Sequence, residues 1–182
     1  MKTYTFILAV LISCATVTKS FSQTSLFSGV NYGSEIEALG ITIGGEFFVS
    51  EKISIAPDFI YYFTNKESEV LGGSEIEVKT KLWELNGNVH YYFVDNSNVG
   101  FYGLGGLNYS QASVDYKQTD IDSGTVEAQF DMSDGEVGIN LGVGANFPIS
   151  SKLTPYAELK YVAASTDQLV IGGGVKFAVG GF

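Results

Sequence analysis

Hydrophobic and polar residues alternate along most of this chain with a period of two. In the stretch LWELNGNVHYYF, residues 82–93, the odd positions are apolar or aromatic apart from Gly87, and the even positions from Glu84 to His90 are polar. Such alternation is typical of a β-strand whose two faces meet different surroundings. Eight segments share it, at approximately 25–32, 39–49, 53–63, 82–93, 99–109, 137–147, 153–162 and 169–179.

The connections between these segments alternate in length. Three are tight polar turns, with the sequences SEK, DNSNV and SSK, whereas residues 64–81 and 110–136 form long connections. Shorter connections at 33–38 and 163–168 complete the series. No helical period, Ser/Pro-rich linker or short repeat interrupts the segments. The pattern therefore predicts one antiparallel up-and-down β-meander.

The two faces of the predicted strands differ sharply in chemistry. From the second segment to the eighth, the odd positions hold only apolar residues, glycine, proline and tyrosine, without a single charge. The Asn, Glu, Lys and Thr residues of these segments all fall at even positions, interleaved with many glycines. Alternation alone leaves open which face is inside, because a soluble barrel buries the apolar face and a membrane barrel turns it towards lipid.

The glycines on the polar face distinguish these two possibilities. A water-exposed strand face usually carries Thr, Lys and Glu, because glycine in a strand loses backbone entropy and provides nothing to pack. Glycine beside bulky residues such as Tyr62, Tyr92, Tyr102 and Tyr156 indicates a crowded interior, as expected inside a barrel of eight strands. We therefore expect the polar face to line the lumen and the apolar face to meet hydrocarbon.

Strand length and aromatic placement support this interpretation. A segment of about 10 residues, tilted by about 40°, spans roughly 25 Å, the height of the apolar band of an outer-membrane barrel. Aromatic residues gather at both ends of the segments, as in the two girdles of such barrels. The predicted fold is an all-β, eight-stranded antiparallel up-and-down transmembrane β-barrel with extended outer hairpins.

The N-terminal residues read as a secretory signal. Lys2 is followed by an apolar run from Phe6 to Ile12 and by a polar stretch that ends in small residues, which predicts cleavage after residue 22. The barrel would then occupy residues 23–182. Cys14 lies in LISC, which also resembles a lipoprotein signal, so the sequence leaves open whether it is lipidated or removed.

The segment pattern of residues 23–182 resembles the small eight-stranded outer-membrane barrels, such as the OmpA-type transmembrane domain and short porin-like proteins of Gram-negative bacteria. The resemblance implies an integral outer-membrane protein that contacts lipid and lipopolysaccharide, with short turns in the periplasm and long loops outside. It also implies a terminal aromatic residue, here Phe182, that the barrel assembly machinery reads. The apolar residues before Phe182 fall at odd positions, whereas Phe182 falls at an even one, so we expect a bulge in VGGF, residues 179–182.

Charge and residue type exclude several functions. A formal net charge of -10, with ten Lys and Arg residues in all, argues against a nucleic-acid partner. The single histidine, His90, is expected to face inward near a short turn as a packed, hydrogen-bonded residue, and no second histidine completes a metal site or catalytic pair. We therefore expect no enzyme activity, no metal and no cofactor.

The inward-facing charges predict a polar network in the lumen. Glu46 and Lys176 are expected at the same height along the barrel axis, and so are Glu84 and Lys160. Because an unpaired charge in a narrow lumen is costly, we expect two ion pairs. Asp58 and Glu158 lie between them, protonated, solvated or hydrogen-bonded to Asn and Tyr. The whole predicted network is Glu46, Asp58, Glu84, His90, Glu158, Lys160 and Lys176.

The two long connections are the candidates for contact with an extracellular partner. They keep the period of two, but apolar residues such as Val78 and Phe130 now fall at even positions, which predicts bulges near Lys81 and Ser133. The candidate contact residues are Asp120, Asp122, Phe130, Asp131, Met132 and Asp134. The aspartates suit either Ca²⁺ or plain solvation, and Phe130 and Met132 suit either a partner or the neighbouring hairpin.

Two prolines conflict with the strand pattern. Pro57 and Pro155 lie within predicted strands, where proline removes a ladder hydrogen bond, so we expect local distortions there. The function predicted from sequence is a non-enzymatic barrel with a mainly filled lumen and interacting outer loops. A narrow passive pore, a lipid-modifying enzyme and a secreted soluble carrier of apolar ligands, similar to a lipocalin, remain as alternatives.

Overall fold

The computed structural model describes residues 24–63, 66–71, 74–96, 98–121 and 124–180, which form nine strands. The strands are β1 (Thr24–Gly33), β2 (Ala38–Phe48), β3 (Ile53–Phe63), β4 (Lys66–Leu71), β5 (Ser74–Asp95), β6 (Gly100–Asp120), β7 (Val126–Asn146), β8 (Leu153–Ala163) and β9 (Gln168–Gly180). No helix in these ranges is long and apolar enough to cross a membrane. The predicted signal peptide, residues 1–22, and Phe182 lie outside the described residues.

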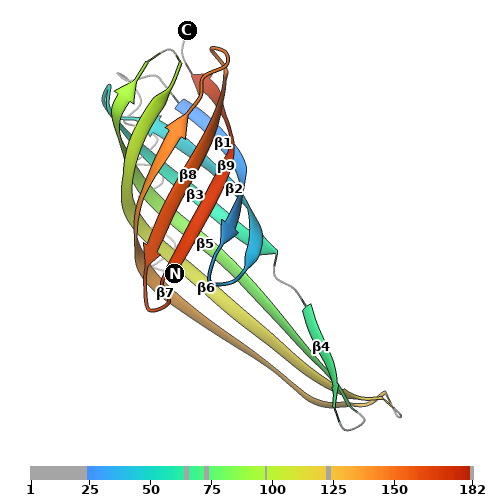
Figure 1. Ribbon diagram of the computed structural model, residues 1–182. Coiled ribbons are helices and arrows are strands. Elements are labelled where there is room, and N and C mark those ends of the chain that lie inside the picture. The colour runs from blue at the N-terminus through green and yellow to red at the C-terminus, as the bar shows by residue number, and fades with distance from the viewer. Residues whose placement is uncertain (1–23, 64–65, 72–73, 97, 122–123, 181–182) are drawn as a thin grey trace, which may run out of the picture.

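Eight of the strands form a closed antiparallel ring (Figure 1). Their order is β3-β2-β1-β9-β8-β7-β6-β5, and pairing of β3 with β5 closes the ring, whereas β4 pairs with β5 outside it. Closure satisfies the backbone groups that lipid cannot hydrogen-bond. The predicted eight-stranded up-and-down barrel is confirmed, and the predicted segments match the ring strands except where β5, β6 and β7 continue much further.

The wall of the barrel has its apolar face outside. Ile41, Leu85 and Leu141 are 45%, 54% and 59% exposed, whereas Tyr102 and Asn140 inside the ring are fully buried. A water-soluble barrel would show the reverse arrangement, because burying apolar surface is its main source of stability. The alternative of a soluble carrier is therefore wrong, and the outward residues form a surface for hydrocarbon.

Aromatic residues lie at both ends of this surface. At one end, the Trp83 ring lies 5.8 Å from the Phe59 ring and 5.7 Å from the Tyr109 ring, between centroids. At the short-turn end, Phe93 stacks on Phe101 at 6.4 Å. These are the positions of the two membrane–water interfaces, where aromatic rings are favoured.

Inward glycines make room for the large inward side chains. A Cβ atom built on Gly144 would overlap the Tyr102 ring, and one on Gly44 would overlap the Phe27 ring. Outward Gly103 has nothing within 4 Å of the same position. The crowding inferred from sequence is therefore present on the lumen side.

The two prolines occupy irregular or terminal positions. The pairing of β2 with β3 lapses between Gly44–Asp58 and Phe47–Ile55, next to Pro57, so the missing N–H falls in a gap of the ladder. Pro155 lies near the short-turn end, where its carbonyl accepts a hydrogen bond from the Phe147 N–H at 2.8 Å. Both predicted distortions are mild.

Strands β5, β6 and β7 extend beyond the ring as a separate sheet. Pairing of β3 with β5 ends at Tyr62–Leu82, and pairing of β7 with β8 ends at Ile139–Ala163. Beyond these points β4 adds to the edge of β5, giving a four-stranded sheet that projects from one end of the barrel (Figure 1). We call this the outer sheet: β4 with residues 74–81, 112–120 and 126–134.

The bulges predicted near Lys81 and Ser133 are wrong. The β5–β6 register runs unbroken from Ser74–Asp120 to Tyr92–Tyr102, and the β6–β7 register passes Ser133 without a shift. The apolar residues move from odd to even positions for another reason. At this level the surroundings of the outward face change from hydrocarbon to water. Apolar residues therefore move to the other face of the same continuous strands.

Register shifts occur at other places. They fall between Tyr92 and Val94, between Gln118 and Thr119, and at the C-terminal strand, where Thr24 pairs with Gly180 and Ser25 with Ala178. The last shift skips Val179, so the bulge predicted in VGGF is confirmed.

Candidate functional site

The short-turn half of the lumen is organised around the carboxylate of Glu46 on β2. It accepts hydrogen bonds from Ser54 Oγ and Tyr92 OH, each at 2.6 Å, and lies 3.1 Å from His90 Nδ1. The Lys176 ammonium forms an ion pair with it at 2.6 Å. The predicted Glu46–Lys176 pair is confirmed, and the four partners of the carboxylate come from β3, β5 and β9.

Aromatic rings enclose this cluster. The His90 ring stacks on the Tyr102 ring at 4.4 Å between centroids, and the Lys176 Nζ atom lies 5.0 Å from Tyr102 and 5.4 Å from Tyr156. These rings add cation–π contacts to the ion pair in a site that excludes solvent. His90 is a packed, hydrogen-bonded interior residue, as predicted.

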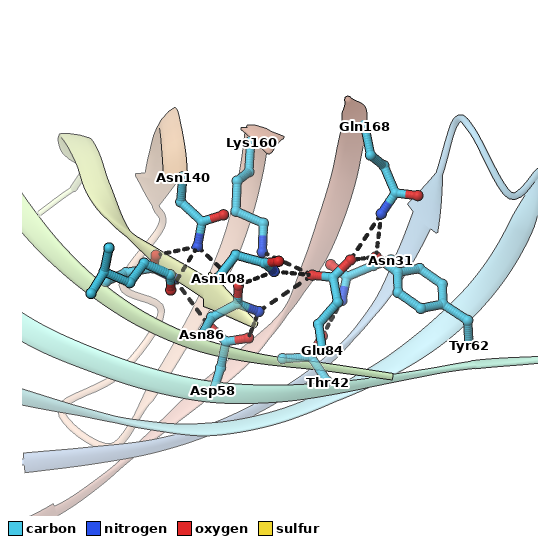
Figure 2. Close-up of polar contacts among 12 residues, drawn as sticks. Asn31, Thr42, Asp58, Tyr62, Glu84, Asn86, Asn108, Asn140, Lys160 and Gln168 are labelled. Atoms are coloured by element: carbon cyan, nitrogen blue, oxygen red, sulfur yellow. Dashed lines mark hydrogen bonds and ion pairs between the residues drawn. The ribbon is translucent and has the colours of Figure 1, made fainter. Parts of the chain in front are cut away.

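The outer half of the lumen is organised around Glu84 on β5 (Figure 2). One carboxylate oxygen accepts from Tyr62 OH at 3.1 Å and from Gln168 Nε2 at 2.8 Å. The other lies 3.6 Å from Lys160 Nζ and accepts from Asn108 Nδ2 at 3.1 Å. The predicted Glu84–Lys160 pair is confirmed, whereas the roles of Tyr62 and Gln168 were not predicted from the sequence.

Amides fill the space between the two clusters. Asp58 accepts hydrogen bonds from Asn86 at 2.8 Å and Asn88 at 3.1 Å, and Asn140 donates to both of these asparagines. Glu158 accepts from Tyr102 OH at 3.0 Å. Of the alternatives left open for Asp58 and Glu158, hydrogen bonding to Asn and Tyr is therefore correct.

The network leaves little empty space in the middle of the lumen. The cavity between Asp58, Glu158 and Lys160 has a volume of about 20 Å³. That is enough for about one water molecule. We call this polar network, with its hydrogen bonds to the side chains of the barrel wall, the lumen plug.

The candidate residues that the structure describes do not gather into a metal site. Within the described ranges no three His, Cys, Asp or Glu side chains come close enough to hold a metal ion. Among the predicted loop aspartates, Asp120 pairs with Ser74 at the tip of the outer sheet and Asp134 pairs with Ala112 at its base. They are therefore far apart along β6 and β7, and Asp122 lies outside the described residues.

One face of the outer sheet carries apolar residues over β5, β6 and β7, whereas on β4 the same face carries Glu67 and Glu69. The register aligns Val78, Tyr116 and Phe130 in one row, with Val114 opposite Met132 in the next. Paired residues of antiparallel strands point to the same side, so these rows form one continuous surface. Phe130 stacks on Tyr116 at 4.7 Å, yet Phe130 and Met132 remain 48% and 61% exposed.

The opposite face of the outer sheet is charged. It includes Asp131 and the ion pair of Lys81 with Asp115, whose Nζ and Oδ2 atoms lie 2.7 Å apart. Hydrogen bonding to Asp115 and its charge raise the pKa of Lys81 above its ordinary value. The two faces of the outer sheet therefore differ in chemistry over β5, β6 and β7.

Comparison with known proteins agrees with this architecture. The family described as outer membrane protein beta-barrel domain matches residues 13–180. The chain belongs to this family. It is an integral β-barrel protein of the bacterial outer membrane. No curated protein matches the sequence.

Solved structures share the fold at low sequence identity. A major outer membrane protein from Thermus thermophilus matches with a TM-score of 0.65 and 12% identity, over 87% of this chain and 99% of that one. Neisserial surface protein A matches with a TM-score of 0.59 and 16% identity, over 87% and 97%. The N-terminal barrel domain of Pseudomonas aeruginosa OprF matches with a TM-score of 0.52 and 14% identity, over the same shares.

Proposed function

We propose that this protein is a non-conducting, non-enzymatic outer-membrane barrel that binds an extracellular partner through the apolar face of its outer sheet. The observation that carries the proposal is the exposure of Phe130 and Met132 on a sheet that projects beyond the barrel. A projecting sheet with apolar residues on one face is not needed to close the barrel, because the ring of eight strands is closed without it.

The filled lumen supports the non-conducting part of the proposal. Both ion pairs and the hydrogen bond from Asn140 to Asn86 join strands that do not pair with each other in the ring. A solute would have to break several buried polar contacts to pass. In planar bilayers we expect no steady channels, and steady, reproducible channels would instead support the alternative of a narrow passive pore.

The strand edges of the outer sheet support the binding part. Among the described strands, residues 126–138 of β7 pair with β6 alone, so one side of this stretch has no strand partner in the described part of the chain. An edge strand of this kind readily accepts an added strand, and the exposed side chains of Phe130 and Met132 would supply its pockets. The partner would lie outside the cell, in the orientation that the resemblance implies.

The test compares cells that display the native protein with cells that display one of three variants. The first replaces residues 66–79 and 114–132 with short turns, the second carries Phe130→Ser and Met132→Ser, and the control carries Gln129→Ser and Asp131→Ser on the opposite face. Crosslinking to extracellular proteins should give a partner that the first two variants lose and the control retains. Loss in the control as well, or retention in the double variant, would contradict the proposal.

A further inference from the structure

The ring consists of two sets of four strands that match in sequence. The first unit is β1, β2, β3 and residues 82–95 of β5, and the second unit is residues 100–110 of β6, residues 136–146 of β7, β8 and β9. The matched stretches include GVNY (29–32) with GLNY (106–109), VSEKI (49–53) with ISSKL (149–153), and Val89 with Val175. Alternating polarity alone gives any two strands some likeness, so features that do not depend on alternation decide whether the match is real.

The matched turns have the same hydrogen bonds. The Ile53 carbonyl accepts from the Val49 and Ser50 N–H groups at 2.9 and 3.2 Å. Ser50 Oγ accepts from the Lys52 and Ile53 N–H groups at 3.4 and 3.1 Å. In residues 149–153 the matched atoms make the same bonds at 3.1, 3.3, 3.3 and 3.1 Å. The turn between β5 and β6 uses an asparagine side chain as its acceptor instead, so this geometry is not common to all the short turns.

Strand pairing follows the same match. In both units the second strand pairs with the third, the third with the fourth, and the fourth with the first strand of the other unit, in the same register. The corresponding pairs are Gly44 with Asp58 and Gly144 with Glu158, Ser54 with His90 and Thr154 with Lys176, and Asn86 with Asn108 and Gly172 with Asn31. Because a register can shift by two residues without turning any side chain to the other face, alternation does not require this agreement.

A β-bulge also occupies the same place in both units. The β5–β6 register skips Phe93, and the β9–β1 register skips Val179. Each skipped residue lies four positions after one of the matched valines, Val89 and Val175. Bulges are specific features of a strand rather than defects, so a shared bulge is strong support for the match.

One pairing differs between the units. Val30 of β1 pairs with Ile41, whereas the matched Leu107 of β6 pairs with Ile139 and not with Leu141, the match of Ile41. The first two strands of the second unit are therefore displaced by two residues, which leaves every side chain on its own face.

The connections at the outer end differ as well. Residues 34–37 and 164–167 are short turns in the ring, whereas the matched connections, residues 111–135 and 64–81, form the outer sheet (Figure 1). The outer sheet thus extends from only one of two corresponding parts of the ring.

We propose that the ring is an internal repeat of one four-stranded unit and that the outer sheet is an elaboration of two connections of that unit. The repeat accounts for two features of the lumen plug. Asp58 and Glu158, between the ion pairs, occupy the same position in the two units. His90 and Lys176 also match, and both contact Glu46, at 3.1 and 2.6 Å.

The first test removes the outer sheet at the places that the match predicts. The variant carries two replacements, ASTD (164–167) for residues 64–81 and SEIE (34–37) for residues 111–135. The second turn then joins Ser110 to Glu136, which pair as Gly33 and Ala38 do. After refolding into lipid vesicles we expect heat-dependent gel migration and a urea midpoint close to that of the native protein.

Two controls accompany this variant. One has Gly-Ser-Gly-Ser in both places and should unfold at a lower urea concentration, because it lacks the turn residues of the matched unit. The other joins SEIE to Gly138 instead of Glu136, which ignores the displacement of two residues, and should also be less stable. A midpoint of either control at or above that of the test variant would overturn the proposal.

The second test is a circular permutant opened between residues 97 and 98, which keeps the outer sheet intact. Thr24 pairs with Gly180 as Phe101 pairs with Val94, so DNSNVG, residues 95–100, should join Gly180 to Thr24. We expect this permutant to fold and to unfold at a higher urea concentration than one joined by Gly-Ser-Gly-Ser-Gly-Ser. Failure of the DNSNVG permutant to fold, or equal midpoints for the two linkers, would overturn the repeat.

Discussion

The Glu46–Lys176 ion pair offers a quantitative test of the lumen plug. Lys176→Met removes the cation and leaves a buried carboxylate, and Glu46→Gln removes the anion and leaves a buried ammonium. Breaking a buried pair from one side typically costs about 3–5 kcal/mol, because the remaining charge is uncompensated. Both groups are almost fully buried here, so we expect each single variant to fall in that range.

The double variant should be much less destabilised than the sum of the singles. The amide oxygen that Glu46→Gln introduces can still accept from Ser54 and Tyr92, which lie 2.6 Å from the carboxylate in the native protein. With both charges gone, about 1–3 kcal/mol should be lost for the weaker hydrogen bonds and the altered packing. The expected coupling energy is therefore about 3 kcal/mol or more, far above the additivity limit for independent sites.

The assay is equilibrium unfolding in urea, with the protein inserted in lipid vesicles and gel migration as the folded-state readout. Lys152→Met, in an exposed short turn, controls for loss of positive charge and should change stability by less than about 0.5 kcal/mol. Additive effects of Glu46→Gln and Lys176→Met would refute the reasoning, since the pair would then not be the contact that holds the plug.

Three further predictions use the same unfolding assay in vesicles. Gly144→Ala should destabilise the barrel by about 1–3 kcal/mol because its Cβ would overlap the Tyr102 ring, whereas Gly103→Ala, in open space on the lipid face, should be neutral or slightly stabilising; equal effects would contradict a crowded lumen. Leu141→Arg on the lipid face should lower the free energy of unfolding by about 2–4 kcal/mol, whereas Gln129→Arg on the outer sheet should leave it almost unchanged. Similar losses in the two variants would show that the membrane boundary is assigned wrongly. Lys81→Met should leave the unfolding midpoint almost unchanged because its pair with Asp115 lies at the surface, with the two side chains 44% and 34% exposed. A clear loss of stability would mean that the outer sheet depends on this contact.

Much of the barrel could be predicted from parity. Each ring strand carries its lumen and lipid residues at alternate positions, so Glu46, Glu84, Lys160 and Lys176 could be placed inside and at matching heights from the sequence alone. Both ion pairs follow from those heights. This success rests on a uniform environment along each strand within the bilayer.

Parity gave the wrong answer where the environment changed. At Lys81 the apolar residues switch sides, and the switch predicts a bulge, although the register is continuous. Sequence alone does not separate a slipped strand from a change of solvent, because both reverse the pattern. The structure distinguishes the two cases because β5, β6 and β7 continue together, in register, beyond the ring.

The finer contacts of the lumen were also beyond the sequence. Tyr62 and Gln168 converge on Glu84 from strands that are far apart in the chain, and the shear of the barrel decides which residues meet across it. The buried Asn108 Oδ1 atom accepts no hydrogen bond from the described residues, and nothing in the sequence indicates this.

The single tryptophan of the chain allows a direct measurement of which face meets lipid. Trp83 lies on the outward face at the outer girdle, and quenching of its fluorescence by brominated lipids reports its depth. In a Trp83→Phe background, Leu141→Trp should be quenched most by bromines near the acyl-chain ends and Gln129→Trp should not be quenched. A Leu141→Trp protein that folds yet escapes quenching would contradict a barrel with its apolar face in the membrane.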